Sequence, residues 1–150
     1  MLFNACKDNV SEIDTQKPMI DLTMEGAFPT SCDTLYFGEE FIIKAILNDN
    51  VELGAYNVGI HHNFDQHTHS TEFDECTFDE TKTAVNPFTY IQDFTIPASL
   101  TSYTITQSMT IPSTDGTALY DAGDYHFEIR LTDKEGWSTH KGLNVKILHR

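Results

Sequence analysis

Apolar and polar residues alternate along most of the chain with a period of two, as they do in β-strands that bury one face. A helix would instead place apolar residues three and four positions apart, and the sequence has no convincing run of that kind. Prolines and turn-forming pairs such as Asp49-Asn50 separate the alternating stretches. The pattern predicts about seven strands, within segments 18–24, 39–50, 53–64, 87–97, 101–112, 123–137 and 141–148.

Short strands without helices predict an all-β fold, and we expect residues 18–150 to form an immunoglobulin-like antiparallel β-sandwich. Tyr125, near the start of the sixth predicted strand, stands where such domains carry a tyrosine corner. The acidic turn 133–136 would form the hairpin into the last strand. In this architecture the third and sixth strands are neighbours in one sheet, and this decides which of their side chains can meet.

The chain is acidic, with a net charge of −14 over 150 residues when the histidines are neutral. Phosphate binding needs clustered lysine and arginine, so neither nucleic acid nor an anionic membrane surface is an expected partner. An acidic surface favours solubility and attracts cations. The sequence also contains no GxSxG, HExxH, P-loop or GxGxxG motif, and we do not expect an enzyme.

Four of the seven histidines fall within residues 61–69, in the run GIHHNFDQHTHS. His67 and His69 are two residues apart, so in an extended segment their rings point the same way. The alternation places Val58 and Ile60 in the core, which turns His61 outward. His126 is turned outward by the same alternation in its own strand. Since these strands are predicted neighbours, His61 and His126 should lie side by side on one exposed face.

We therefore predict a metal site formed by His61, His67, His69 and His126. A register slip of one residue would replace His61 by His62. Asp65 is either a fifth donor or a partner that orients a ring. Three or more nitrogen donors favour Zn(II), Cu(II) or Ni(II). The two remaining histidines are expected to be ordinary surface residues: His140 and His149.

If the protein leaves the cytoplasm, the two cysteines other than Cys6 are readily oxidised to a disulfide. Cys32 and Cys76 have no second cysteine at CxxC spacing, so a cysteine-ligated metal is the weaker reading and a Cys32–Cys76 disulfide the expected one. Leu2 to Cys6 resembles the end of a bacterial lipoprotein signal, in which the cysteine is lipidated. Residues 1–17 are thus expected to be a signal remnant, lipidation site and tether, and the lipid the only membrane contact.

Residues 64–86 are polar, acidic and long for a connection in a sandwich, as functional loops often are. His67 and His69 lie within this segment. A disulfide at Cys76 would pin the loop and allow it to hold a binding geometry.

Two other functions remain open from the sequence. A glycan- or protein-binding module would leave the histidines incidental, with Trp137, Tyr120 and Tyr125 as an aromatic platform or Trp137 simply capping the core. A metal-dependent hydrolase would need a general base such as Glu72 or Glu128. Weak calcium binding is also open in the acidic loops near Asp74, Asp79 and Asp133.

The runs LGAYNVGIHHNFDQHTH, NPFTYIQDFTIP and DAGDYHFEIRLTDKEGWSTHKGLNVKI resemble a lipoprotein family of Bacteroidetes, domain of unknown function 4625. The similarity covers residues 18–147, and the histidine-rich run is its most specific part. It implies a lipoprotein of the outer membrane, at the cell surface or in the periplasm, with an immunoglobulin-like domain and no established activity. Our first hypothesis is a module for metal acquisition, delivery or buffering, whose partner is an outer-membrane transporter or a glycan.

Overall fold

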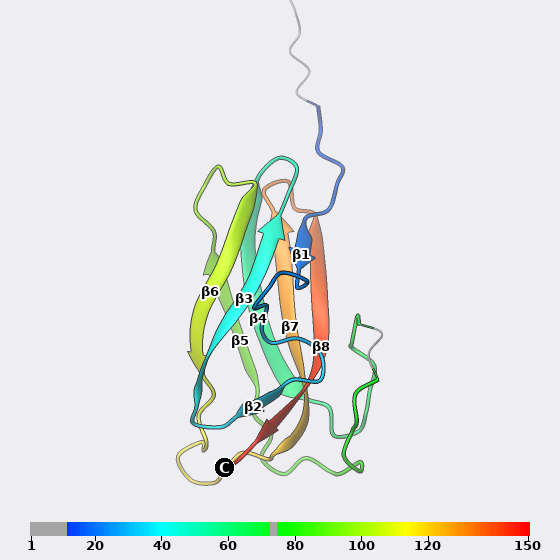
Figure 1. The fold of residues 1–150 in the computed structure, drawn as a ribbon, viewed down its shortest axis with the longest axis vertical. Helices are drawn as coiled ribbons and strands as arrows, with labels where there is room; N and C mark the ends of the chain where they lie inside the picture. Colours follow the sequence, from blue (N-terminus) through cyan, green and yellow to red (C-terminus); the bar gives the residue numbers. More distant parts are fainter. Residues whose placement is uncertain (1–11, 73–74) are drawn as a thin grey trace, which may run out of the picture.

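The computed structural model describes residues 12–72 and 75–150, which form eight strands and no helix (Figure 1). The strands that end at residues 48, 110 and 133 are each followed by a proline, a glycine or an Asx turn, as the sequence shows. The strands are β1 (Met19–Asp21), β2 (Thr34–Tyr36), β3 (Glu40–Asn48), β4 (Leu53–His62), β5 (Tyr90–Thr95), β6 (Ser102–Thr110), β7 (Gly123–Asp133) and β8 (Ser138–Leu148).

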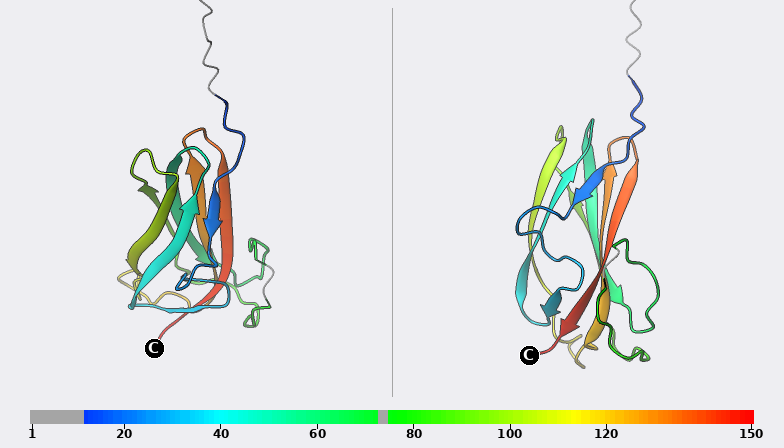
Figure 2. Two further views of the ribbon diagram at one scale, coloured as in Figure 1. Left: turned by 45° about the horizontal axis from the view of Figure 1, so that its top comes forward. Right: turned by 45° about the vertical axis from the view of Figure 1, so that its right-hand side comes forward.

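The strands form two sheets packed face to face (Figure 2). The smaller sheet has the order β1-β3-β6 and the larger the order β2-β8-β7-β4-β5. Alternate residues of each strand point into the space between the sheets and form one apolar core. In β3, for example, Ile43, Ala45 and Leu47 are buried, whereas Ile42 on the other face is exposed.

The predicted β-sandwich is confirmed, and each of the seven predicted segments contains a strand. The predicted third and sixth strands, β4 and β7, are antiparallel neighbours. The tyrosine corner is present, because the Tyr125 hydroxyl donates a hydrogen bond to the Asp121 carbonyl at 2.6 Å.

Two details of the predicted fold were wrong. An eighth strand, β2, was not foreseen, because three residues are too few to show an alternation. It pairs in parallel with the end of β8, so the larger sheet is not wholly antiparallel. This short strand begins two residues after Cys32 and lies at the edge of the sheet, where it covers the end of β8.

The long connection between β4 and β5 lies against the outer side of the larger sheet, beside β7 and β8 (Figures 1 and 2). The Cys32–Cys76 disulfide is confirmed and ties this connection to the chain just before β2. The outer face of the sheet is therefore partly covered.

The chain before β1 contacts the domain from Asp14 onward: the indole Nε1 of Trp137 donates to the Asp14 carbonyl at 3.0 Å. The expected lipidation site, Cys6, lies outside the described residues, as does most of the predicted signal and tether. Within the described part of the chain, no helix has the length and apolar character needed to cross a membrane.

Candidate metal centre

The centre begins with a cross-strand pair of histidines on the outer face of the larger sheet. His61 of β4 and His126 of β7 are direct register partners, and their ring centroids are 5.2 Å apart. The register follows from the core-facing residues beside them, since a slip of one residue would expose the apolar face of the strand.

The β4–β5 loop then brings two more imidazoles onto this pair. His67 and His69 join His61 and His126 so that all six ring-centroid distances lie between 4.6 and 5.5 Å. One ring nitrogen of each histidine lies within 4.8 Å of those of the other three. Four imidazoles from two strands and one loop can thus reach a single metal ion.

We expected His126 to lie on an exposed face, and this was wrong, because His126 is completely buried. The strand alternation does turn it away from the core, but the loop passes over it and excludes solvent. The His126 Nε2 lies 3.1 Å from the backbone carbonyl of His67. His61 and His67 are half-buried and His69 is exposed, so the cluster extends from a buried floor to the surface.

Hydrogen bonds fix which nitrogens can bind a metal. The backbone carbonyl of His67 can only accept a hydrogen bond, so the Nε2 of His126 must donate to it. The Nδ1 of His126 then carries no proton and has a free lone pair. This Nδ1 is buried and has no hydrogen-bond partner. The carboxylate of Asp65 accepts from Nδ1 of His67 at 2.5 Å, which leaves Nε2 of His67 free. Asp65 therefore orients a ring, as ligand histidines are oriented in metal sites.

The distances among the remaining nitrogens suit coordination better than hydrogen bonding. Nε2 of His61 lies 3.3 Å from Nε2 of His67 and 3.2 Å from Nδ1 of His69. A single proton on His61 cannot make two good hydrogen bonds at once. Tetrahedral Zn(II), with bonds of about 2.0–2.1 Å, places its ligand nitrogens about 3.3–3.4 Å apart.

Burial keeps His126 and His61 uncharged. It lowers the pKa of His126 from 6.5 to about 4, with the three neighbouring imidazoles acting in the same direction. Burial also lowers the pKa of His61, against the opposing influence of Glu128. Both rings are therefore neutral at physiological pH, which is the form that binds metals.

We expect the metal-free protein to lose stability on acidification between about pH 6.5 and pH 4. The unfolded chain takes up a proton at the ordinary pKa of histidine, whereas folded His126 resists it, so the free energy of unfolding falls by roughly 2–3 kcal/mol as the pH drops. Denaturant titrations at several pH values measure this. In the variant His126→Gln the free energy of unfolding should depend less on pH than in the exposed control His140→Gln. The same pH dependence in both variants would show that His126 is not the cause.

Gly142 of β8 allows the loop to approach the sheet. A Cβ at this position would clash with the carbonyl oxygen of His69. The Thr71 amide donates to the Gly142 carbonyl at 2.9 Å, and the Gly142 amide donates to the Thr71 hydroxyl at 3.0 Å. The sequence analysis missed this residue, because a glycine within a strand pattern signals only that some backbone comes close.

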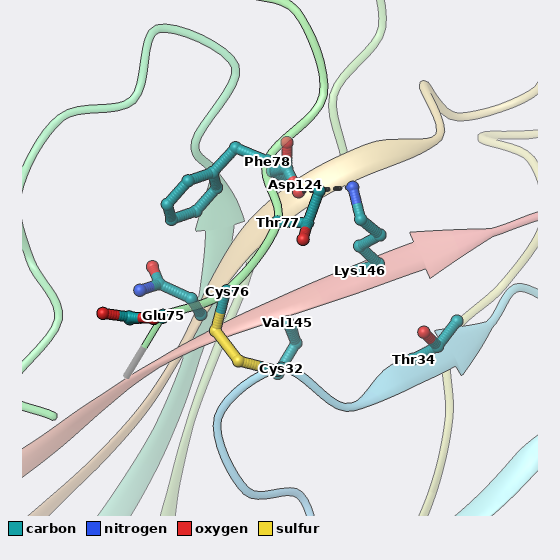
Figure 3. A pocket seen from close by; sticks show the side chains of 10 residues that line it. Cys32, Thr34, Glu75, Cys76, Thr77, Phe78, Asp124, Val145 and Lys146 are labelled. Carbon is teal, nitrogen blue, oxygen red and sulfur yellow. Dashed lines mark hydrogen bonds and ion pairs between the residues drawn. A yellow bond between two sulfur atoms is a disulfide. The ribbon is translucent and has the colours of Figure 1, made fainter. Parts of the chain in front are cut away.

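The far part of the loop is fixed by charge and by the disulfide. Lys146 of β8 lies 2.6 Å from a carboxylate oxygen of Asp79 and 3.0 Å from one of Asp124. Figure 3 shows the Lys146–Asp124 pair and the Cys32–Cys76 bond beside β8. The histidine-bearing segment thus leaves β4 directly and is anchored again beyond His69 by these contacts.

Two of the predicted ligands lie outside the set of converging nitrogens. His62 faces the opposite side of β4 and packs on Phe64, with ring centroids 4.9 Å apart, because the register did not slip. Asp65 contacts His67 rather than the centre. His140 and His149 are exposed, as expected, although His149 also stacks on Phe37.

The residues considered for other functions are placed differently. The prediction that Trp137, Tyr120 and Tyr125 form an aromatic platform was wrong. Tyr125 is fully buried at the start of β7, whereas Trp137 lies beyond the opposite end of that strand. Glu72, considered as a general base, is paired with Lys141 at 2.6 Å. Glu128 lines an open depression beside the cluster together with His61, His69, Arg130 and His140.

These features define a small disulfide-linked β-sandwich with a four-histidine cluster that can hold a metal ion. The chain belongs to the family described as domain of unknown function DUF4625, whose model matches residues 4–148. No curated protein matches the chain at a significant level.

Among solved structures, the chain is distantly similar to the crystal structure of Spo0M, a sporulation control protein from Bacillus subtilis. The similarity covers 89% of this chain and 49% of that one, with a TM-score of 0.41 and 9% sequence identity. The chain therefore spans about half the length of that protein, and a likeness of this size carries no argument about function.

Proposed function

We propose that the protein binds one transition-metal ion through His61, His67, His69 and His126 and serves metal acquisition, delivery or buffering. The observation that carries the proposal is the convergence of four imidazole nitrogens within 4.8 Å of one another. The buried, unpartnered Nδ1 of His126 supports it, since an unpaired polar atom in the interior is costly unless something binds it.

The donor set favours Zn(II), Cu(II) or Ni(II) over calcium or magnesium, because all four donors are nitrogen. Zn(II) fits the spacing of the His61, His67 and His69 nitrogens. A fourth protein nitrogen fills a tetrahedral site, and a filled site suits storage or transfer better than hydrolysis.

We further propose that the protein is a lipoprotein of the outer membrane, at the cell surface or in the periplasm. The disulfide supports an oxidising compartment. The sequence around Cys6 and the resemblance to lipoproteins of Bacteroidetes support the lipid anchor. The exposed edge at His69 gives a partner such as a transporter access to a bound ion.

Calorimetric titration with Zn(II), Cu(II) and Ni(II) tests the binding proposal. We expect one equivalent to bind near neutral pH, and the affinity to fall below about pH 6, because protons compete for the imidazole lone pairs. Elemental analysis of the purified protein should find the same metal. The absence of heat with all three metals near neutral pH would rule the proposal out and favour a glycan- or protein-binding module.

A further inference from the structure

Three aspartates from distant parts of the chain converge at the other end of the sandwich from the histidines. Asp14 precedes β1, Asp49 follows β3, and Asp133 ends β7. One carboxylate oxygen of each lies within 4.8 Å of those of the other two. The turns that follow β3 and β7 lie at the end where the described chain enters the domain (Figure 1).

Each carboxylate is held through one oxygen and leaves the other free. One oxygen of Asp14 accepts hydrogen bonds from the Gln16 amide and the Asn50 side chain. One oxygen of Asp49 accepts from the backbone amides of residues 51 and 52. One oxygen of Asp133 accepts from the Trp137 amide. The second oxygen of all three is buried without a hydrogen-bond partner. Asp14 and Asp133 are only 7% and 4% exposed, so solvent does not compensate for the missing bonds.

The charges of the three groups are also uncompensated. Within residues 12–72 and 75–150, no lysine, arginine or histidine forms an ion pair with any of them. Like charges this close in a buried place repel one another strongly unless a cation lies between them.

We propose that Asp14, Asp49 and Asp133 form a Ca²⁺ site. The donors are all oxygen, which hard cations prefer, whereas the histidine cluster offers nitrogen. Ca²⁺ bonds of about 2.3–2.6 Å allow ligand oxygens on opposite sides of the ion to be about 4.6–5.2 Å apart, so three oxygens within 4.8 Å of one another are close enough to bind one ion.

The site would join the segment before β1 to the turns at the end of the sandwich. Asp14 lies outside both sheets, whereas Asp49 and Asp133 belong to the framework of β3 and β7. A bound Ca²⁺ therefore fixes where the preceding chain meets the domain. This inference does not depend on the histidine cluster, which lies near the other end of β4, roughly 30 Å away by the rise of a ten-residue strand.

Terbium luminescence tests the site, because Tb³⁺ occupies Ca²⁺ sites and emits when a nearby indole is excited. Trp137 is the single tryptophan, and its Nε1 contacts the Asp14 carbonyl at 3.0 Å. We expect sensitised emission that Ca²⁺ abolishes by competition. Trp137→Phe should remove most of the emission, because it removes the indole that absorbs the exciting light.

Charge-removing variants decide whether these carboxylates bind the ion. Asp49→Asn should weaken Ca²⁺ binding at least about tenfold, since ligand charge sets affinity in such sites. Asp14→Asn should do the same and leaves the sheets untouched, which guards against misfolding of the first variant. The exposed control Asp93→Asn and the variant His61→Ala/His69→Ala should bind Ca²⁺ normally. The proposal is overturned if Ca²⁺ at millimolar concentration does not displace Tb³⁺, or if Asp14→Asn binds as tightly as Asp93→Asn.

Discussion

Replacing His67 with alanine is expected to weaken Zn(II) binding more than about 100-fold. The loss of a partner that only orients a ligand costs about 10–100-fold in metal sites, and loss of the ligand itself costs more. His126→Gln should have an effect of the same size, because the amide can still donate to the His67 carbonyl but offers no imidazole nitrogen. Competition with a chromophoric chelator measures both affinities.

Matched variants distinguish the centre from its surroundings. Asp65→Ala should cost only about 10–100-fold, because this carboxylate orients His67 and does not reach the ion. His62→Ala and His140→Ala remove imidazoles that lie outside the cluster, and Zn(II) affinity should stay the same. Equal losses in all of these variants would show nonspecific binding to histidines and contradict the assigned centre.

Removal of the disulfide is expected to cost about 4 kcal/mol of unfolding free energy. Cys32 and Cys76 are 44 residues apart, and the chain-entropy model gives that value for a loop of this length. The variant Cys32→Ser/Cys76→Ser should also bind Zn(II) more weakly, because the loop that carries His67 and His69 loses one of its anchors.

Denaturant unfolding in the presence of a chelator measures the disulfide effect without a contribution from bound metal. Both proteins should carry Cys6→Ser, which removes the third thiol and prevents exchange. Unchanged stability after removal of the bond would contradict the prediction. Unchanged Zn(II) affinity would show that the Lys146 ion pairs and the Gly142 contact hold the loop without it.

The fold was largely predictable, because one local signal recurs in each strand. Core-facing residues such as Val58, Ile60, Phe127 and Ile129 alternate with outward-facing ones, and all four are fully or almost fully buried. The strand β2 escaped the prediction because its pairing depends on the distant end of β8 rather than on its own three residues.

Only the part of the candidate site that lies on strands could be predicted from the sequence. The alternation rule turned His61 and His126 to one face, and the neighbouring strands made them partners. The same rule could not show that His126 is buried, because its cover is a loop without a repeating pattern. The convergence of Asp14 with Asp49 could not be predicted from the sequence either, since three strands separate these residues along the chain.

The sequence by itself determined the two-layer β architecture, the buried face of the long strands and the cysteine pair, because each follows from short-range alternation or from residue type. The tertiary structure alone decided how the β4–β5 loop lies over the sheet, which nitrogens are free to bind a metal, and which carboxylates meet. These depend on hydrogen bonds and close approaches between residues far apart in the chain, such as that of His69 to Gly142, and no local pattern encodes them.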